Sequence, residues 1–310
     1  MNLLARRDPL AALGRLLGSV EAVRNGRALF ALLLTFSTAG LLLAMAGASL
    51  ARDDGLWTVL QAGAALTVAF YGSNATGLLL MDQARGLPVR EVADAFQHAL
   101  RSAHRLLVVV VLVSLLVAAL VAAVSAGLFV ARLPVAGPFV FALVVPAGVL
   151  LLGLGALVLA GVVGPLAAPA VWSGRSVRST LRLLFVQARE RLLFMALLMS
   201  ALGALTAAVA ALSTFVVVTG GRIVAALAVL VTGVDVPAQQ LMAGLFGFGL
   251  RSLGPAGAPV TQTPHGVGAL VGGGMVFVLA LVVPGLVYLR GVCALYLSVA
   301  EDDEPTDMPV

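Results

Sequence analysis

Residues 174–193 read GRSVRSTLRLLFVQARERLL, and this stretch decides the fold. Read as a helix, it gathers apolar side chains on one face at spacings of three and four. These are Val177, Leu181, Leu184, Phe185, Ala188 and Leu192. The opposite face carries mostly Arg178, Ser179, Arg182, Arg189 and Glu190. Because a long apolar run, residues 192–218, follows at once, we predict an amphipathic helix on a membrane surface, here called an elbow, that leads into a membrane span.

The composition indicates a membrane protein. Of the 310 residues, 61% are hydrophobic and 11% are charged, whereas a soluble domain has roughly 25% charged residues. All 19 basic residues are arginine, and they stand beside apolar stretches, which is typical of topology signals and of contact with anionic lipid. We therefore expect membrane lipids as partners and no nucleic acid.

An elbow followed by two spans occurs three times along the chain. The first unit is residues 1–80 with spans 28–50 and 57–80, the second is 81–166 with spans 106–130 and 139–163, and the third is 167–300 with spans 192–218 and 267–289. Gly86-x-x-Val89-Arg90 in the second elbow matches Gly174-x-x-Val177-Arg178 in the third. We predict an all-α, polytopic membrane protein, one integral membrane domain of six transmembrane helices and three cytoplasmic elbow helices, with a duplicated layout as a hypothesis.

Prolines and loops set the expected boundaries. Gly164-Pro165 and Pro169 are expected to end the fourth span, and Pro284 to break the sixth. The connection 220–266 holds two short apolar pieces, 223–231 and 241–250, each too short to cross alone, so we expect a re-entrant or interfacial insertion on the outer side. Residues 301–310 form an acidic tail.

Arginine is distributed unequally between the two sides of these spans. The three elbows carry fourteen arginines, and the opposite side carries four, namely Arg52, Arg132, Arg222 and Arg251. The positive-inside rule therefore predicts an inner (plasma) membrane protein with both termini and all elbows in the cytoplasm. Seven elbow arginines are predicted to contact anionic lipid: Arg90, Arg101, Arg105, Arg178, Arg182, Arg189 and Arg191.

Two polar side chains stand inside predicted spans. Asn74 either lines a permeation path or makes an interhelical hydrogen bond, and the second interpretation is favoured about three to one. Arg290 either pairs with a substrate or extends its side chain to the cytoplasmic interface. Extension to the interface is the simpler explanation. Rows of small residues, Ala118-Ala122-Ala126 and Ala196-Ser200-Ala204-Ala208, either mark helix contacts or reflect abundant alanine.

No pattern in the sequence predicts catalysis. His98 and His104 are six residues apart and do not share a helical face. The sequence has no paired carboxylates inside a span, no Gly-x-Ser-x-Gly and no phosphate-binding glycine loop, and its single cysteine, Cys293, excludes a multi-cysteine metal site. We expect no enzyme, no cofactor and no metal.

The third elbow resembles a known membrane family. Residues 164–169, Ser173-Gly174-Arg175-Ser176 and the amphipathic helix are similar to a pattern in the membrane domain of some glycerophosphoryl diester phosphodiesterases and in the YciC-like inner-membrane proteins. Gly86-Leu87-Pro88-Val89 and Ala294-Leu295-Tyr296 fit the same pattern. Trp172-Ser173-Gly174 stands where that family often has an acidic residue, and the chain has no phosphodiesterase domain. This resemblance implies an inner-membrane protein without an agreed activity.

A second resemblance competes with the first. Exporter permeases of the ABC-2 type have an N-terminal elbow, six spans, a cytoplasmic coupling helix after the second span and re-entrant pieces before the sixth, whereas the long third elbow departs from that plan. We therefore expect a non-enzymatic scaffold or accessory subunit of a membrane complex, with protein partners or further copies of itself. The alternative is the transmembrane subunit of an ABC-2-like exporter or another transporter, and an enzyme acting on lipids is a third possibility.

Overall fold

The computed structural model describes residues 9–134, 136–232 and 264–300, and within them the regular structure is entirely helical. The elements are α1 (Pro9–Leu17), η1 (Gly18–Arg24), α2 (Gly26–Leu50), α3 (Gly55–Ala84), α4 (Val92–Val130), α5 (Gly137–Val158), η2 (Leu159–Val163), α6 (Gly164–Trp172), α7 (Val177–Glu190), α8 (Leu192–Thr232) and α10 (Pro264–Ala300). The prediction of an all-α protein is confirmed for this part of the chain.

Six helical stretches are long and apolar enough to cross a membrane, as predicted. They are Gly26–Leu50, Gly55–Ala84, Val92–Val130, Gly137–Trp172, Leu192–Val224 and Val278–Val299. About 20 apolar residues suffice to cross a bilayer. The chain therefore has the helices of a multi-pass membrane protein.

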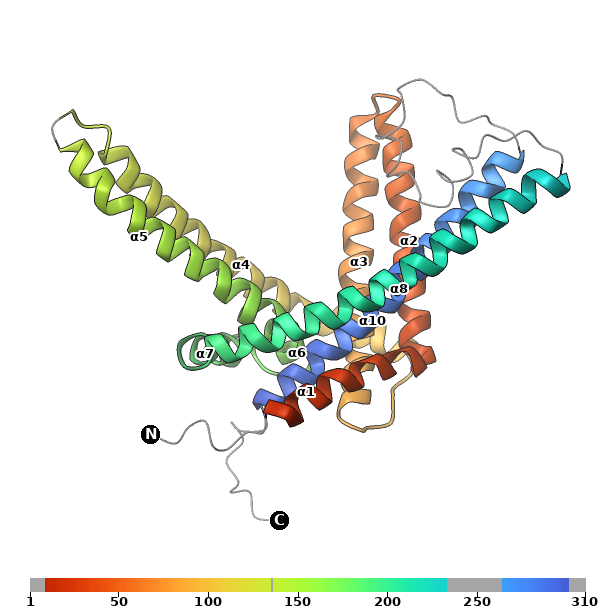
Figure 1. Ribbon diagram of the computed structural model, residues 1–310, viewed down its shortest axis with the longest axis horizontal. Helices are drawn as coiled ribbons and strands as arrows, with labels where there is room; N and C mark the ends of the chain where they lie inside the picture. Colours follow the sequence, from red (N-terminus) through yellow and green to blue (C-terminus); the bar gives the residue numbers. More distant parts are fainter. Residues whose placement is uncertain (1–8, 135, 233–263, 301–310) are drawn as a thin grey trace, which may run out of the picture.

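The spans converge at one end and diverge at the other (Figure 1). α2 and α3 stand side by side, the hairpin of α4 and α5 leans to one side of them, and α8 with α10 leans to the other. α1, α6 and α7 lie where the spans converge, and α1 packs against α10 there. α8 has 41 residues, so at about 1.5 Å per residue it is about 60 Å long and must tilt in, or extend beyond, a hydrocarbon core of about 30 Å.

Several boundaries differ from the predictions because helices continue where breaks were expected. The second elbow was predicted over residues 81–105, but no separate helix forms there, because residues 92–105 are the first turns of α4. Only α1 with η1 and α7 are separate from the spans that follow them. Residues 223–231 continue α8 to Thr232, and α10 passes through Pro284 without ending. The piece 241–250, Arg251 and the acidic tail 301–310 lie outside the described residues.

The fourth span does not end at Gly164-Pro165. A π-helical turn, η2, joins α5 to α6, and the Gly164 N–H donates to the Leu159 carbonyl five residues back. Proline has no N–H and its ring crowds the carbonyl four residues back, so an α-helix is disrupted there. The wider π turn changes the hydrogen-bond register at that point, and the helix continues past Pro165 and Pro169 to Trp172.

Glycines permit the closest contacts between helices where the spans converge. A Cβ on Gly77 of α3 would lie 2.2 Å from the Trp172 ring of α6, and one on Gly72 would lie 2.0 Å from Oγ1 of Thr35 in α2. On α10, a Cβ on Gly291 would lie 2.2 Å from Leu202 of α8. The alanine row at 118, 122 and 126 is instead exposed, so within the described chain it is glycine that allows this close packing.

Replacement of Gly77 by alanine should destabilise the fold, because the new methyl group overlaps a buried indole ring. Overpacking of this kind costs about 1–3 kcal/mol. The measurement is the midpoint of thermal unfolding of the detergent-solubilised protein. Gly63→Ala is the matched control, since it lies on the same helix with nothing within 4 Å of the added Cβ. Equal midpoints for the two variants would contradict this packing.

Candidate functional site

The connection between α3 and α4 begins with a left-handed glycine. Gly86 has φ +69°, its N–H donates to the Gln83 carbonyl at 3.2 Å, and the Leu87 N–H donates to the Asp82 carbonyl at 3.0 Å. This pair of bonds is a Schellman motif, which glycine allows because it has no Cβ. The motif ends α3 and turns the chain back, so that Arg90 returns to the side of Asp82.

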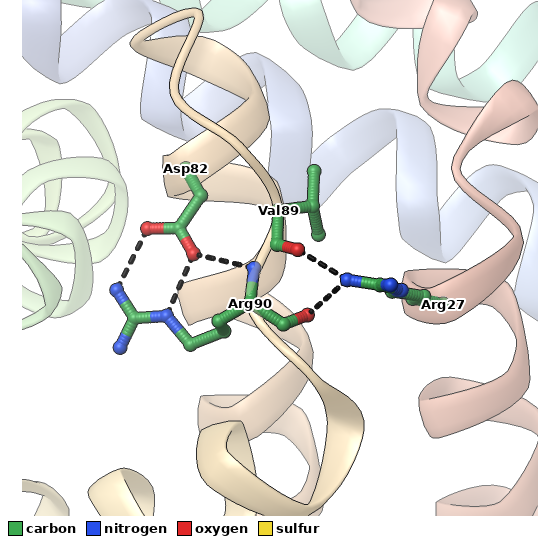
Figure 2. Close-up of polar contacts among 4 residues, drawn as sticks. All are labelled: Arg27, Asp82, Val89 and Arg90. Atoms are coloured by element: carbon green, nitrogen blue, oxygen red, sulfur yellow. Dashed lines mark hydrogen bonds and ion pairs between the residues drawn. The ribbon is translucent and has the colours of Figure 1, made fainter.

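Asp82 and Arg90 form a bidentate ion pair (Figure 2). Arg90 Nε donates to Asp82 Oδ2 at 2.6 Å, and Nη2 donates to Oδ1 at 2.7 Å. The Arg90 backbone N–H also donates to Oδ2, at 3.4 Å. The Asp82 side chain is 8% exposed and that of Arg90 is 31% exposed. The hydrogen bond to Asp82 raises the pKa of Arg90 while burial opposes it, so the guanidinium stays charged and available to its partner.

Arg27, in the first turn of α2, holds the same connection from the other side. One of its guanidinium nitrogens donates to the backbone carbonyls of Val89 and Arg90, the latter at 3.1 Å (Figure 2). Nearby, Asn25 Nδ2 donates to Gln83 Oε1 at 3.2 Å, while Asn25 Oδ1 caps α2 by accepting from the Ala28 N–H. The start of α2, the end of α3 and the approach to α4 are thus one hydrogen-bonded unit.

Asn74 and Trp172 connect α3 to α6. The indole N–H of Trp172 donates to Asn74 Oδ1 at 2.9 Å, and Asn74 Nδ2 donates to the Phe70 carbonyl of its own helix at 2.8 Å. Both side chains are buried. Asn74 therefore makes the interhelical hydrogen bond that the sequence favoured, with an indole as its partner.

A second Schellman motif joins α6 to α7 and to α10. Gly174 has φ +91°, and its N–H and that of Arg175 donate to the Val171 and Ala170 carbonyls. The Tyr296 hydroxyl of α10 accepts from Arg175 Nε at 2.9 Å and lies 2.7 Å from the Ser173 hydroxyl. The Arg175 guanidinium also stands 5.9 Å from the centre of the Tyr296 ring, a cation–π distance.

Among the described residues, Gly86 and Gly174 are the two glycines with positive φ, and they are the two that match in the sequence. The equivalence ends a few residues later. Val177 is the first residue of α7, whereas Val89 precedes the start of α4 by three residues. A repeat of the helix end is therefore present, while the duplicated layout as a whole remains a hypothesis.

A shallow concavity of about 440 Å³ beside the ion pair is lined by Asp82, Leu87, Pro88, Arg90, Asp94 and His98. The Asp82 carboxylate is already occupied by Arg90, and across residues 9–134, 136–232 and 264–300 no group of three histidine, cysteine or acidic side chains could hold a metal. The arrangement holds helices together and has the character of a structural hub.

The predicted arginines take different positions. Arg90 is engaged by Asp82, whereas Arg101 and Arg105 are exposed on the first turns of α4, and Arg178, Arg182 and Arg189 are exposed on α7. Arg191 is half-buried at the joint between α7 and α8. Arg290 is half-buried in α10, and its Nε is buried without a hydrogen-bond partner.

Sequence reasoning missed Asp82, Trp172, Arg175 and Tyr296 as members of this hub. For Asp82 a signal existed, because it is the one acidic residue within residues 55–84 and a Gly-Leu-Pro turn separates it from Arg90. The partners of Trp172 and Tyr296 are about 100 residues distant or more, so no local pattern predicts them.

Comparison with known proteins gave no match to this chain among the family models, the curated proteins or the solved structures. The six long apolar helices of the described residues suggest the class of multi-pass helical membrane proteins.

Replacement of Asp82 by asparagine should destabilise the hub, because the Arg90 guanidinium loses its charged partner. Charge-assisted hydrogen bonds of this kind contribute about 1.5–3 kcal/mol. A double-mutant cycle of Asp82→Asn and Arg90→Gln, measured by thermal unfolding in detergent, should give a clear coupling energy. Asp94→Asn is the control, since it removes an exposed carboxylate from the same concavity. Strict additivity of the two substitutions would show that the pair contributes nothing.

Proposed function

We propose that the chain is a non-enzymatic subunit of the inner membrane, a scaffold or accessory component of a larger membrane complex. The observation that carries this proposal is the bare hairpin of α4 and α5. Only 6% of the residues in the most apolar stretch of each of these spans are buried, compared with 56% for α3 and 50% for α10. The hairpin is held at its base and offers most of its surface to whatever surrounds it in the bilayer.

The distribution of arginine supports a cytoplasmic location for the converging end. The elbow arginines of α7 and the first turns of α4 belong to that end, while Arg52 and Arg132 stand in the turns at the far ends of the hairpins. Under the positive-inside rule the arginine-rich end is cytoplasmic. The start of α1 and the end of α10 lie together at this end, which favours both termini in the cytoplasm.

The alternative function is the transmembrane subunit of a transporter. The concavity beside the α3–α4 connection favours it, because a coupling helix after the second span would receive an ATPase there. Such a subunit should copurify with an ATPase in mild detergent, and this association should depend on exposed residues of 86–105 such as His98 and Arg101.

A photo-crosslinking residue at Leu116 or Leu143 should give discrete protein adducts in intact membranes, because both side chains are more than 70% exposed on the bare hairpin. The measurement is the mass of the adducts and the identity of the captured chains, a second copy of this protein included. The control is the same residue at Leu152, which is 37% exposed on the same hairpin and should give fewer adducts. Crosslinks to lipid alone from all three positions would contradict the scaffold proposal.

A cysteine at Asn74 should resist water-soluble thiol reagents, because Asn74 is 4% exposed and enclosed by Trp172 and its own helix. The native Cys293 is fully buried, and the Cys293→Ala variant, which has no cysteine, serves as the background for labelling. A cysteine at the exposed Gln97 is the positive control. Rapid labelling at position 74 would support a water-filled path and hence the transporter alternative.

A further inference from the structure

The amphipathic helices at the converging end leave large apolar side chains exposed. In α1 and η1, the apolar stripe Leu13, Leu17, Val20 and Val23 is 38–59% exposed. The side that packs against the protein is formed by Leu16, Ser19 and Ala22, all of them 4% exposed or less. A helix in water turns its large apolar side chains inward, so this stripe needs a non-aqueous neighbour.

α7 also leaves one large apolar side chain exposed. The face packed against the protein consists of Thr180, Leu183, Leu184 and Gln187, whereas Phe185 is 68% exposed. Thr180 Oγ1 and Gln187 Oε1 are buried without hydrogen-bond partners. The helix thus buries two polar side chains beside Leu183 and Leu184 and leaves its one aromatic ring exposed.

The exposed surface of α7 is divided into an apolar row and a basic row. The apolar row consists of Phe185, which is exposed, and Leu181, which is half-buried against the protein four residues earlier. Arg178, Arg182 and Arg189, all exposed, form the row beside it. At about 100° per residue, Glu190 falls on the side away from Phe185. Glu190 directly follows Arg189 and projects about 100° from it, so the acidic side chain lies at the edge of the arginine row.

The short connection to α8 keeps the end of α7 close to the start of that span. A single non-helical residue, Arg191, separates the two helices. The exposed surface of α8 begins at once, with Leu193 75% exposed and Leu197 70% exposed. Exposed apolar side chains thus lie on both sides of this joint, Phe185 on α7 and Leu193 and Leu197 on α8.

We infer that α7 is a binding surface for anionic phospholipid. Phe185 and its row enter the boundary of the acyl chains, and Arg178, Arg182 and Arg189 contact the phosphate-bearing head groups. The stripe of α1 and η1 enters the same leaflet. Charge complementarity and continuity with the lipid-facing surface of α8 favour a bilayer over a protein as the occupant. The inference rests on the proposed membrane placement and not on a scaffold role.

The first arm of the test measures immersion of α7 in full-length protein in nanodiscs of phosphatidylglycerol and phosphatidylcholine. Spin labels are attached at Phe185→Cys and, as a control on the opposite side, Glu190→Cys, both in a Cys293→Ala parent. The label at 185 should be accessible to oxygen and shielded from a water-soluble nickel chelate, and the label at 190 should show the reverse. Nickel access at 185 would place α7 in water, and shielding from both agents would indicate a protein partner; either result overturns the inference.

The second arm measures the choice of lipid. The variant replaces Arg178, Arg182 and Arg189 with glutamine, and the matched control replaces Arg52, Arg132 and Arg222, which are equally exposed. The preference for spin-labelled phosphatidylglycerol over phosphatidylcholine should fall at least about fivefold in the variant, the change expected for one basic residue near an anionic surface, and stay unchanged in the control. An equal preference in both proteins overturns the head-group assignment even where position 185 is immersed.

Failure of the membrane placement can be distinguished from failure of the lipid surface. A cysteine at Arg52 should react with an impermeant thiol reagent from outside the cytoplasm only. Reaction from the cytoplasmic side would overturn the proposed orientation, whereas the two nanodisc arms do not depend on which leaflet α7 occupies.

Discussion

A carboxylate buried at the end of a membrane span has to be paired, and the pairing of Asp82 organises this protein. An unpaired carboxylate there would carry a large desolvation cost. Arg90 provides this pairing with two hydrogen bonds from its guanidinium and one from its backbone N–H. Because Arg90 can return only if the chain reverses after α3, the carboxylate also requires the left-handed glycine at 86. Arg27 then fixes the reversed segment to α2, so one charge determines how three helices meet.

Two other polar contacts lie at the same end of the helices, while Ser49 joins α2 to Gln61 of α3 at the far end. Trp172 and Asn74 join α6 to α3, and Tyr296 joins α10 to the turn before α7. Between apolar spans in lipid, hydrophobic burial supplies little drive for association, and hydrogen bonds and close packing act in its place. Glycines at 72, 77 and 291 bring the backbones within reach, so these two polar contacts and the close contacts occur together.

The sequence predicts the six spans because each requires only a sufficient apolar length, a property that can be counted along the chain. Boundaries were less predictable. No glycine or proline occurs between Val92 and Ser125, so nothing in the chain separates an elbow from the third span, and α4 is continuous. Pro165 indicates a break, but a π turn resolves the clash at the level of the backbone. In both cases the outcome depends on how the helix is hydrogen-bonded and not on apolar length.

The candidate site was also predictable from the sequence only in part. Amphipathicity correctly separates arginines from leucines on residues 177–190, but it cannot say which side faces the protein. The orientation of the helix depends on contacts with residues distant in sequence. Those residues cover Thr180 and Gln187 and leave Phe185 exposed. Beside a bilayer the same arrangement is consistent, because protein, lipid and water are three different media and one helix can present a separate face to each. The hub made by Asp82, Trp172 and Tyr296 is what allows it, since it holds the helices in place by polar contacts and leaves the large apolar side chains free to face lipid.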